Sequence, residues 1–139
     1  MIIRNGLVMA ILAAALLAGC TISSTDQAGE ERAMAAVQEW IALVDAGQYA
    51  ESWDTAAPFF QQTTSRQKWQ ESLATGRRPL GKVVSRTLHS KLRTQFVPGA
   101  PRGEYEVMEF TTSFEGKKAA LERITPMKVA YGQWRVAGY

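Results

Sequence analysis

Apolar and polar positions follow two different periods along this chain, one in each half. In the first half, apolar side chains recur every three or four residues, which is the spacing of one helix face. These positions are Met34, Val37, Ile41 and Val44. Asp26 is expected to cap this helix at its start, and Gly47 is expected to stop it. The pattern predicts one long helix before residue 47.

Two shorter helices are predicted next. The first covers Tyr49–Ala56 and ends before Pro58, which can start a further helical turn because proline suits the first position of a helix. The second covers Arg66–Thr75, with Ser65 as its N-terminal cap and Gly76 after its last turn.

In the second half, the period changes to two, which is typical of strands. Within Val84–Phe96, the even-numbered positions are mainly apolar and the odd-numbered positions are polar, so the even face is expected to point inward. A second strand is predicted over Glu104–Phe114. Its apolar residues are odd-numbered at the start and even-numbered at the end, and a β-bulge near Met108–Glu109 would bring both sets to one face. A third strand is predicted over Lys118–Val129, and a fourth from Gln133 to the end.

Helices followed by an antiparallel meander predict an α+β fold, with N-terminal helices packed on a curved four-stranded antiparallel sheet. Four tryptophans can anchor its core: Trp40, Trp53, Trp69 and Trp134. Trp53 is expected to be buried in that core, so its replacement by alanine should cost about 3–5 kcal/mol.

The N-terminal segment has the features of an export signal. Arg4 precedes an uncharged, mostly apolar run of 13 residues, from Gly6 to Ala18. A membrane-spanning helix needs about 20 residues, so this run is better explained as the apolar part of a signal peptide. It ends in Leu17-Ala18-Gly19-Cys20, which resembles the bacterial lipobox, with cleavage between Gly19 and Cys20.

The lipobox implies a lipoprotein with three parts. Residues 1–19 would be the signal peptide, residues 20–27 a lipidated N-terminus with a short tether, and residues 28–139 one α+β domain. Diacylglyceryl on the thiol of Cys20, with an N-acyl chain such as palmitate, would anchor the protein stably. The expected location is the cell envelope. Thr21, in place of an aspartate, indicates the outer membrane facing the periplasm if the source is Gram-negative.

Composition excludes several classes of function. The net charge is only +3, and no basic stripe of the kind that binds nucleic acid is visible. One cysteine and one histidine cannot build an internal disulfide or a Cys/His metal site. A metal site made of carboxylates alone is not excluded by this count, but the sequence shows no motif for one, and no metal, cofactor or nucleic acid is assigned. The expected partners are the membrane, through Cys20, and an envelope protein or a small ligand.

Arg86 is the most unusual residue of the predicted sheet, because it falls on the apolar face of its strand. A buried guanidinium needs a carboxylate partner, and Glu109 and Glu122 lie in strands that could neighbour it. With Tyr105, these residues form a candidate pocket or ion pair. The alternative is an arginine that bends its head group into water. His89 falls on the polar face, so no catalytic residue is assigned.

Several motifs resemble family 4019 of the bacterial domains of unknown function. They include Trp40-x-x-Leu43-Val44-Asp45-x-Gly47-x-Tyr49-x-x-Ser52-Trp53, Pro98-Gly99-Ala100-Pro101 and Trp134-Arg135-Val136-x-Gly138-Tyr139. The resemblance covers nearly all of the chain after residue 20 and implies a cone-shaped fold similar to nuclear transport factor 2 and the cystatins. It brings no known activity. The chain has Arg102 where the family has aspartate.

Three hypotheses for the function remain open. The domain could be a non-enzymatic envelope module that binds a protein or a small ligand. It could instead be a cone-fold enzyme acting on a small molecule, or a purely structural lipoprotein. The absence of a catalytic motif in the sequence favours the first and third hypotheses over the second.

Replacement of the lipobox cysteine tests the export hypothesis. Cys20→Ala should block processing, because no other side chain at the cut can accept the lipid, and should leave a larger precursor. Immunoblotting and detergent phase separation measure both effects. A variant that is cut normally and partitions as the wild type does would contradict the lipobox assignment.

Overall fold

The computed structural model describes residues 24–139, in which helices come first and a sheet follows. The helices are α1 (Ser24–Asp45), α2 (Tyr49–Asp54), α3 (Pro58–Thr63), α4 (Arg66–Gly76) and the short 3₁₀ turn η1 (Arg78–Leu80). The strands are β1 (Val83–Thr94), β2 (Tyr105–Phe114), β3 (Lys117–Lys128) and β4 (Trp134–Gly138), with the turn η2 (Ala130–Gly132) before β4. The α+β prediction is confirmed. The predicted signal peptide and Cys20 lie outside the described residues.

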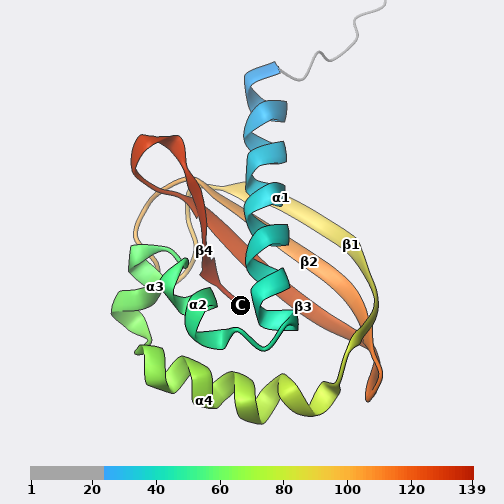
Figure 1. The fold of residues 1–139 in the computed structure, drawn as a ribbon. Coiled ribbons are helices and arrows are strands. Elements are labelled where there is room, and N and C mark those ends of the chain that lie inside the picture. The colour runs from blue at the N-terminus through green and yellow to red at the C-terminus, as the bar shows by residue number, and fades with distance from the viewer. Residues whose placement is uncertain (1–23) are drawn as a thin grey trace, which may run out of the picture.

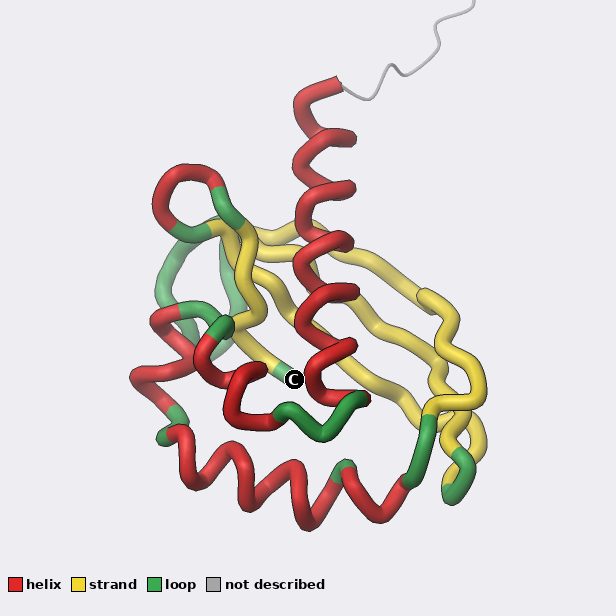
Figure 2. The backbone as a smooth tube through the Cα atoms, viewed as in Figure 1, coloured by secondary structure: helices red, strands yellow, loops and turns green. Residues whose placement is uncertain are grey.

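The four strands form one antiparallel sheet in the order β1-β2-β3-β4. Helix α1 crosses one face of this sheet, and its first turns project beyond the strands (Figure 1). Helices α2, α3 and α4 gather around the other end of α1, where the C-terminus also lies (Figure 2). No helix among residues 24–139 is long and apolar enough to cross a membrane.

Local sequence signals account for most helix boundaries. The Ser65 hydroxyl accepts a hydrogen bond from the Lys68 amide at 3.2 Å, so it caps α4 as predicted. Pro58 occupies the first turn of α3, where its missing N–H costs nothing. Gly47 adopts a left-handed φ of 77° directly after α1, a conformation that glycine reaches without strain.

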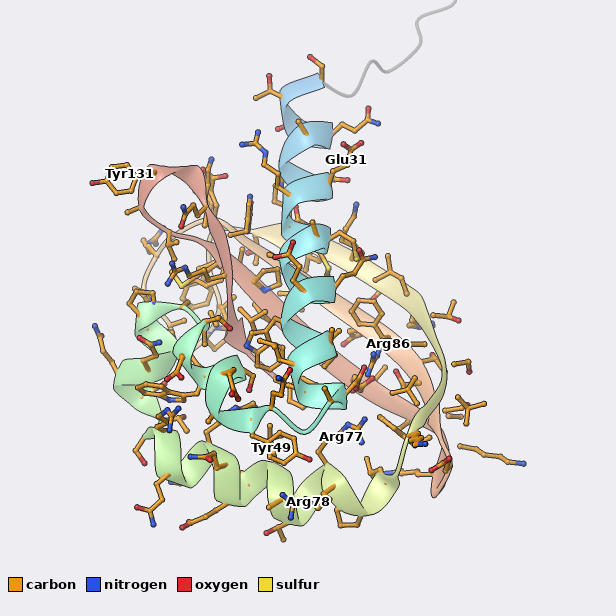
Figure 3. All side chains as sticks on the ribbon, viewed as in Figure 1. Glu31, Tyr49, Arg77, Arg78, Arg86 and Tyr131 are labelled. Carbon is orange, nitrogen blue, oxygen red and sulfur yellow. The ribbon has the colours of Figure 1, made fainter. Side chains whose placement is uncertain are left out.

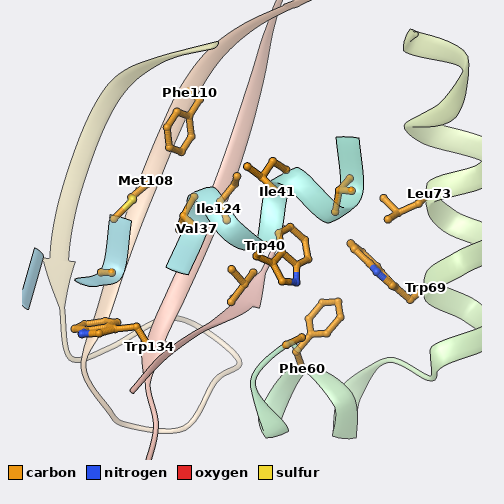
Figure 4. Close-up of a cluster of buried hydrophobic side chains, with 14 of the residues drawn as sticks. Val37, Trp40, Ile41, Phe60, Trp69, Leu73, Met108, Phe110, Ile124 and Trp134 are labelled. Atoms are coloured by element: carbon orange, nitrogen blue, oxygen red, sulfur yellow. The ribbon is translucent and has the colours of Figure 1, made fainter. Parts of the chain in front are cut away.

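The core lies between α1, the short helices and the inner face of the sheet (Figure 4). Its larger members are Val37, Trp40, Ile41, Val44, Tyr49, Phe60, Trp69, Leu73, Met108, Phe110, Ile124, Trp134 and Val136. Trp69 packs edge-to-face on Phe60, with ring centroids 5.0 Å apart. Trp53 is only partly buried at the margin of this cluster, whereas Trp40 is 3% exposed. Trp40 is therefore the stronger anchor.

The start of α1 differs from the prediction. The helix is already formed at Ser24, so Asp26 lies inside its first turn and is not the N-terminal cap. The Asp26 carboxylate instead accepts a hydrogen bond from Arg93 at 3.1 Å. A partner from the sheet holds this aspartate, and residues 24–27 of the predicted tether are helical.

The predicted bulge in β2 is also wrong. Leu88 pairs with Phe110 and Ser90 with Glu109, so the extra residue is His89, on the neighbouring strand β1. From Glu106 onward, β2 itself alternates regularly, with its even-numbered residues buried. Because side chains alternate along a strand, one extra residue reverses which positions point inward beyond it.

That exchange overturns the predicted inward face of β1. Beyond His89, the residues that point toward α1 are Lys91 and Arg93, which reach acidic partners on that helix. Leu92, expected inside, is 63% exposed. Val84 is 69% exposed beside a second register shift at the start of the strand.

The burial of Trp40 predicts a large effect on stability. Trp40→Ala should lower the free energy of unfolding by about 3–5 kcal/mol, because it leaves a cavity in a closed core. Urea unfolding measures this loss. Leu121→Ala is the matched control, since Leu121 is 62% exposed, and it should change stability by less than about 0.5 kcal/mol. Equal losses in both variants would contradict this account of the core.

Candidate functional site

Arg86 joins α1 to two strands of the sheet. From β1, its Nε donates to the Glu122 carboxylate of β3 at 2.8 Å, and its Nη1 donates to Asp45 at the end of α1 at 2.7 Å. Its Nη2 reaches both carboxylates, at 3.1 Å for Asp45 and 3.3 Å for Glu122. The Arg86 side chain is 15% exposed. Each carboxylate is therefore bound by two nitrogens of one guanidinium, the stronger geometry for such pairs.

Glu122 has further partners besides Arg86. Its Oε2 accepts a hydrogen bond from the Thr112 hydroxyl, and its Oε1 accepts one from the Tyr139 hydroxyl at 2.6 Å. The residue is 6% exposed. A carboxylate so deeply buried must be compensated by donors, and here three side chains supply them.

A second arginine completes the network. Arg77 donates to Asp45 at 3.0 Å and to the Gly81 carbonyl at 2.8 Å, and its guanidinium lies 4.4 Å from the centroid of the Phe114 ring. Figure 3 shows Arg77 and Arg86 close together near the C-terminal end of α1. Two cations and two carboxylates give the cluster no net charge.

The protonation states in this cluster follow from its contacts. Burial raises the pKa of Glu122, but the hydrogen bonds from Arg86, Thr112 and Tyr139 outweigh burial and hold the pKa below its ordinary value of 4.5. Asp45 shows the same balance, with burial opposed by Arg86 and Arg77, and its pKa is also lowered. Burial and the bond to Glu122 both raise the pKa of Tyr139. At neutral pH, both carboxylates are ionised and the tyrosine is protonated.

The cluster is continuous with the aromatic core. The Tyr139 ring packs edge-on against Trp40 and Trp69, with centroids 5.5 and 6.1 Å away. Both indoles donate to Ser52: Trp40 to its carbonyl at 2.7 Å and Trp69 to its hydroxyl at 2.9 Å. A movement of the Glu122 carboxylate would thus disturb the packing of the helices.

The candidate residues from the sequence separate into two places. Arg86 and Glu122 meet, whereas Glu109 lies on the opposite face of the sheet and binds Arg123 at 2.6 Å. Tyr105 is buried at the far end of β2, where its hydroxyl donates to the Pro101 carbonyl at 2.5 Å. Glu109 and Tyr105 are therefore not part of the Arg86 cluster.

The sequence patterns assign no role to Asp45, Arg77 or Tyr139, although all three belong to the cluster. Asp45 and Tyr139 do fall within the motifs that carry the family resemblance, which was the available signal. Nothing in the local sequence distinguishes Arg77 from the neighbouring Arg78, which lies near Tyr49 instead.

A second set of ion pairs fixes the first half of α1. Arg93 of β1 binds Asp26 at 3.1 Å and Glu106 of β2 at 2.8 Å, and Lys91 contacts Glu30. Glu106 is fully buried, and its Oε2 has no hydrogen-bond partner in the structure. Basic residues of β1 thus meet acidic residues of α1 at both ends of the helix.

Two hollows at the surface of α1 lie beside this framework. A groove of about 430 Å³ separates α1 from β4 and the end of α2. It is lined by Ala36, Glu39, Trp40, Leu43, Asp54, Thr55, Trp134, Arg135 and Val136. A smaller hollow of about 260 Å³, on the β1 side of α1, has Asp45 and Arg86 in its wall. Residues 24–139 hold no group of three His, Cys, Asp or Glu side chains that could bind a metal ion.

The pairing of Arg86 with Glu122 predicts a measurable coupling. Arg86→Met should destabilise the fold by about 3 kcal/mol, because it strands a buried carboxylate. Arg86→Met combined with Glu122→Met should cost less than the two single changes added together, with a coupling energy of about 0.5–3 kcal/mol by urea unfolding. The exposed pair Arg123 and Glu109 is the control, with coupling of at most about 1 kcal/mol. Zero coupling between Arg86 and Glu122 would contradict a shared cluster.

The lowered pKa values of Asp45 and Glu122 predict instability in acid. A carboxyl group whose pKa is lower in the folded state stabilises the fold fully above its unfolded pKa. That stability is lost as the pH falls through the folded value. The free energy of unfolding should therefore decline below about pH 4.5, the ordinary value for glutamate, and the decline should be shallower in Glu122→Gln. An identical acid profile in wild type and Glu122→Gln would contradict the assignment.

Comparison with known proteins identifies the family but not an activity. No curated protein matches the sequence. The model of one family, described as "Protein of unknown function (DUF4019)", matches residues 36–139. The match takes in the end of α1, the short helices and the whole sheet, which together hold Asp45, Arg77, Arg86, Glu122 and Tyr139. The chain belongs to the DUF4019 family.

Proposed function

We propose that this protein is a lipid-anchored module of the bacterial envelope that binds a ligand or partner at its surface and does not act as an enzyme. The observation that carries the proposal is the state of Asp45 and Glu122. Both are bound by Arg86 and held ionised, so neither is poised for acid–base work near neutral pH.

The enzymatic alternative would need a carboxylate and a tyrosine that converge on an open cavity. Glu122 and Tyr139 do converge, with 2.6 Å between their oxygens. Their pKa values move away from neutrality in opposite directions. Burial and the bond to Glu122 raise the pKa of Tyr139, whereas the hydrogen bonds from Arg86, Thr112 and Tyr139 outweigh burial and lower the pKa of Glu122. Arg86 and Asp45, not Glu122 and Tyr139, line the neighbouring hollow. This arrangement favours a structural role for the pair.

The groove between α1 and β4 is the better candidate for binding. Its lining includes the buried residues Trp40 and Trp134 and the exposed residues Glu39 and Arg135. Apolar surface with a few polar groups around it is the usual composition of a ligand site. Asp54, also in the lining, is already bound to Arg66 at 2.9 Å.

Two further parts of the proposal rest on the sequence. The lipobox motif at Gly19-Cys20 supports cleavage, lipidation and an envelope location, with the outer membrane facing the periplasm as the address in a Gram-negative source. The long helix packed across an antiparallel meander supports kinship with the cone fold of nuclear transport factor 2.

The four indole N–H groups provide the test of binding. Trp40 and Trp134 line the groove, while Trp53 and Trp69 do not and serve as internal controls. In NMR titrations with a panel of short peptides and aromatic fragments, at least one probe should shift the Trp40 and Trp134 indole signals saturably and leave the other two unchanged. If no probe distinguishes the two pairs, the groove is not a binding site, and a purely structural lipoprotein becomes the better explanation.

A further inference from the structure

Two large aromatic side chains are exposed on loops of the described domain. Tyr131, at the tip of the β3–β4 turn, is 100% exposed. Phe96, just after β1, is 60% exposed. The other exposed aromatic residue, Tyr139, is 37% exposed and is held by Glu122. Phe96 and Tyr131 therefore need a separate explanation.

Both residues lie at the end of the domain where α1 begins. Arg93, three residues before Phe96, binds Asp26 in the first turn of α1, which places the end of β1 beside that turn. Tyr131 borders a hollow that Arg32 and Ala35 of α1 also line. Figure 3 shows Tyr131 level with Glu31, and Figure 1 shows α4 at the opposite end of the molecule.

The backbone at Tyr131 strengthens the case for a contact with another surface. Its φ of 60° is a left-handed conformation that side chains other than glycine and asparagine rarely adopt. The side chain is fully exposed, so no packing within residues 24–139 explains why an aromatic residue occupies this position. Strain of this kind is typical of contact and functional sites.

The chain length between the anchor and α1 limits where this end can be. Four Cα–Cα steps separate Cys20 from Ser24, which is at most about 14 Å. Arg32 lines the same hollow as Tyr131 and so lies at a similar height along α1. It is eight residues from Ser24, or about 12 Å at the helical rise. A lipid on Cys20 would keep both aromatic loops within about 30 Å of the bilayer surface along the chain.

We propose that Phe96 and Tyr131 lie in the headgroup layer of the lipid bilayer and set the orientation of the domain on the membrane. This inference rests on the proposed lipid anchor at Cys20. Tyrosine is enriched at the membrane–water interface, because its ring is apolar and its hydroxyl stays hydrated. Since α1 projects beyond the β3–β4 turn, the helix must incline toward the bilayer, with α4 facing away from it.

Two of the acidic residues at this end are paired with cations. Asp26 and Glu30, on the first turns of α1, are each paired with a basic residue of β1. Glu31, next to Glu30, is exposed and accepts a hydrogen bond from Gln27 rather than from a cation. The pairing of Asp26 and Glu30 reduces the repulsion that these two carboxylates would meet at an anionic membrane surface.

Depth measurements on the full-length protein can test this orientation. The protein is reconstituted into vesicles of phosphatidylethanolamine and phosphatidylglycerol, and nitroxide labels are placed on Gln133→Cys and Gln95→Cys, next to the two aromatic residues. Ser72→Cys on α4 is the distant control. At each position, the nitroxide collides with oxygen and with a water-soluble nickel chelate. The ratio of its oxygen collisions to its chelate collisions should be several-fold higher at the two loop positions than at position 72. Similar ratios at all three positions would overturn the inference and leave Phe96 and Tyr131 to a protein partner.

Two controls separate this inference from the anchor itself. The sequence has one cysteine, so a wild-type chain lipidated at Cys20 has no free thiol and should take no label. Labelling of the wild type would overturn the proposed anchor, and this inference with it. In labelled Gln133→Cys, the added changes Phe96→Asn and Tyr131→Asn should lower the collision ratio toward that of Ser72→Cys. Leu121→Asn, at a site about as exposed as Phe96, should leave the ratio unchanged. An unchanged ratio in the variant that lacks both aromatic residues would refute their role.

Discussion

The guanidinium of Arg86 is the contact on which the arrangement of helices and sheet depends. It binds Asp45 at the end of α1 and Glu122 at the centre of β3, so one side chain connects the long helix to two strands. Glu122 then holds Tyr139, whose ring packs against Trp40 and Trp69. The polar cluster and the aromatic core are thus parts of one structure, and a change in either alters the other.

The same charges explain why the cluster is better suited to stability than to chemistry. Buried carboxylates become useful acids or bases when burial raises their pKa toward neutrality. Here the hydrogen bonds outweigh burial, so the pKa values of Asp45 and Glu122 fall. The groove between α1 and β4 lies outside this cluster and can accept a ligand without disturbing it.

The helices, the four strands and the inward position of Arg86 were predictable from local patterns. The spacing of apolar residues, the helix caps and the turn residues depend only on nearby sequence. Ser65 caps α4 and Gly47 ends α1, as expected. The inner face of β1 was not predictable, because one unpaired residue at His89 exchanges its two sides, and only the pairing with β2 reveals the shift. Asp45 was missed for a related reason: an acidic residue on a polar helix face has the same sequence signature whether it faces water or an arginine.

The protonation of Glu122 is the most direct test of this account. Carbon-13 NMR of the side-chain carboxyl group, followed through an acid titration, reports its pKa in the folded protein. A pKa below the ordinary 4.5 is expected, and it should return toward or above 4.5 when Arg86 is replaced by methionine. A wild-type pKa raised toward neutrality would contradict it, and would make Glu122 and Tyr139 an acid–base pair available for catalysis.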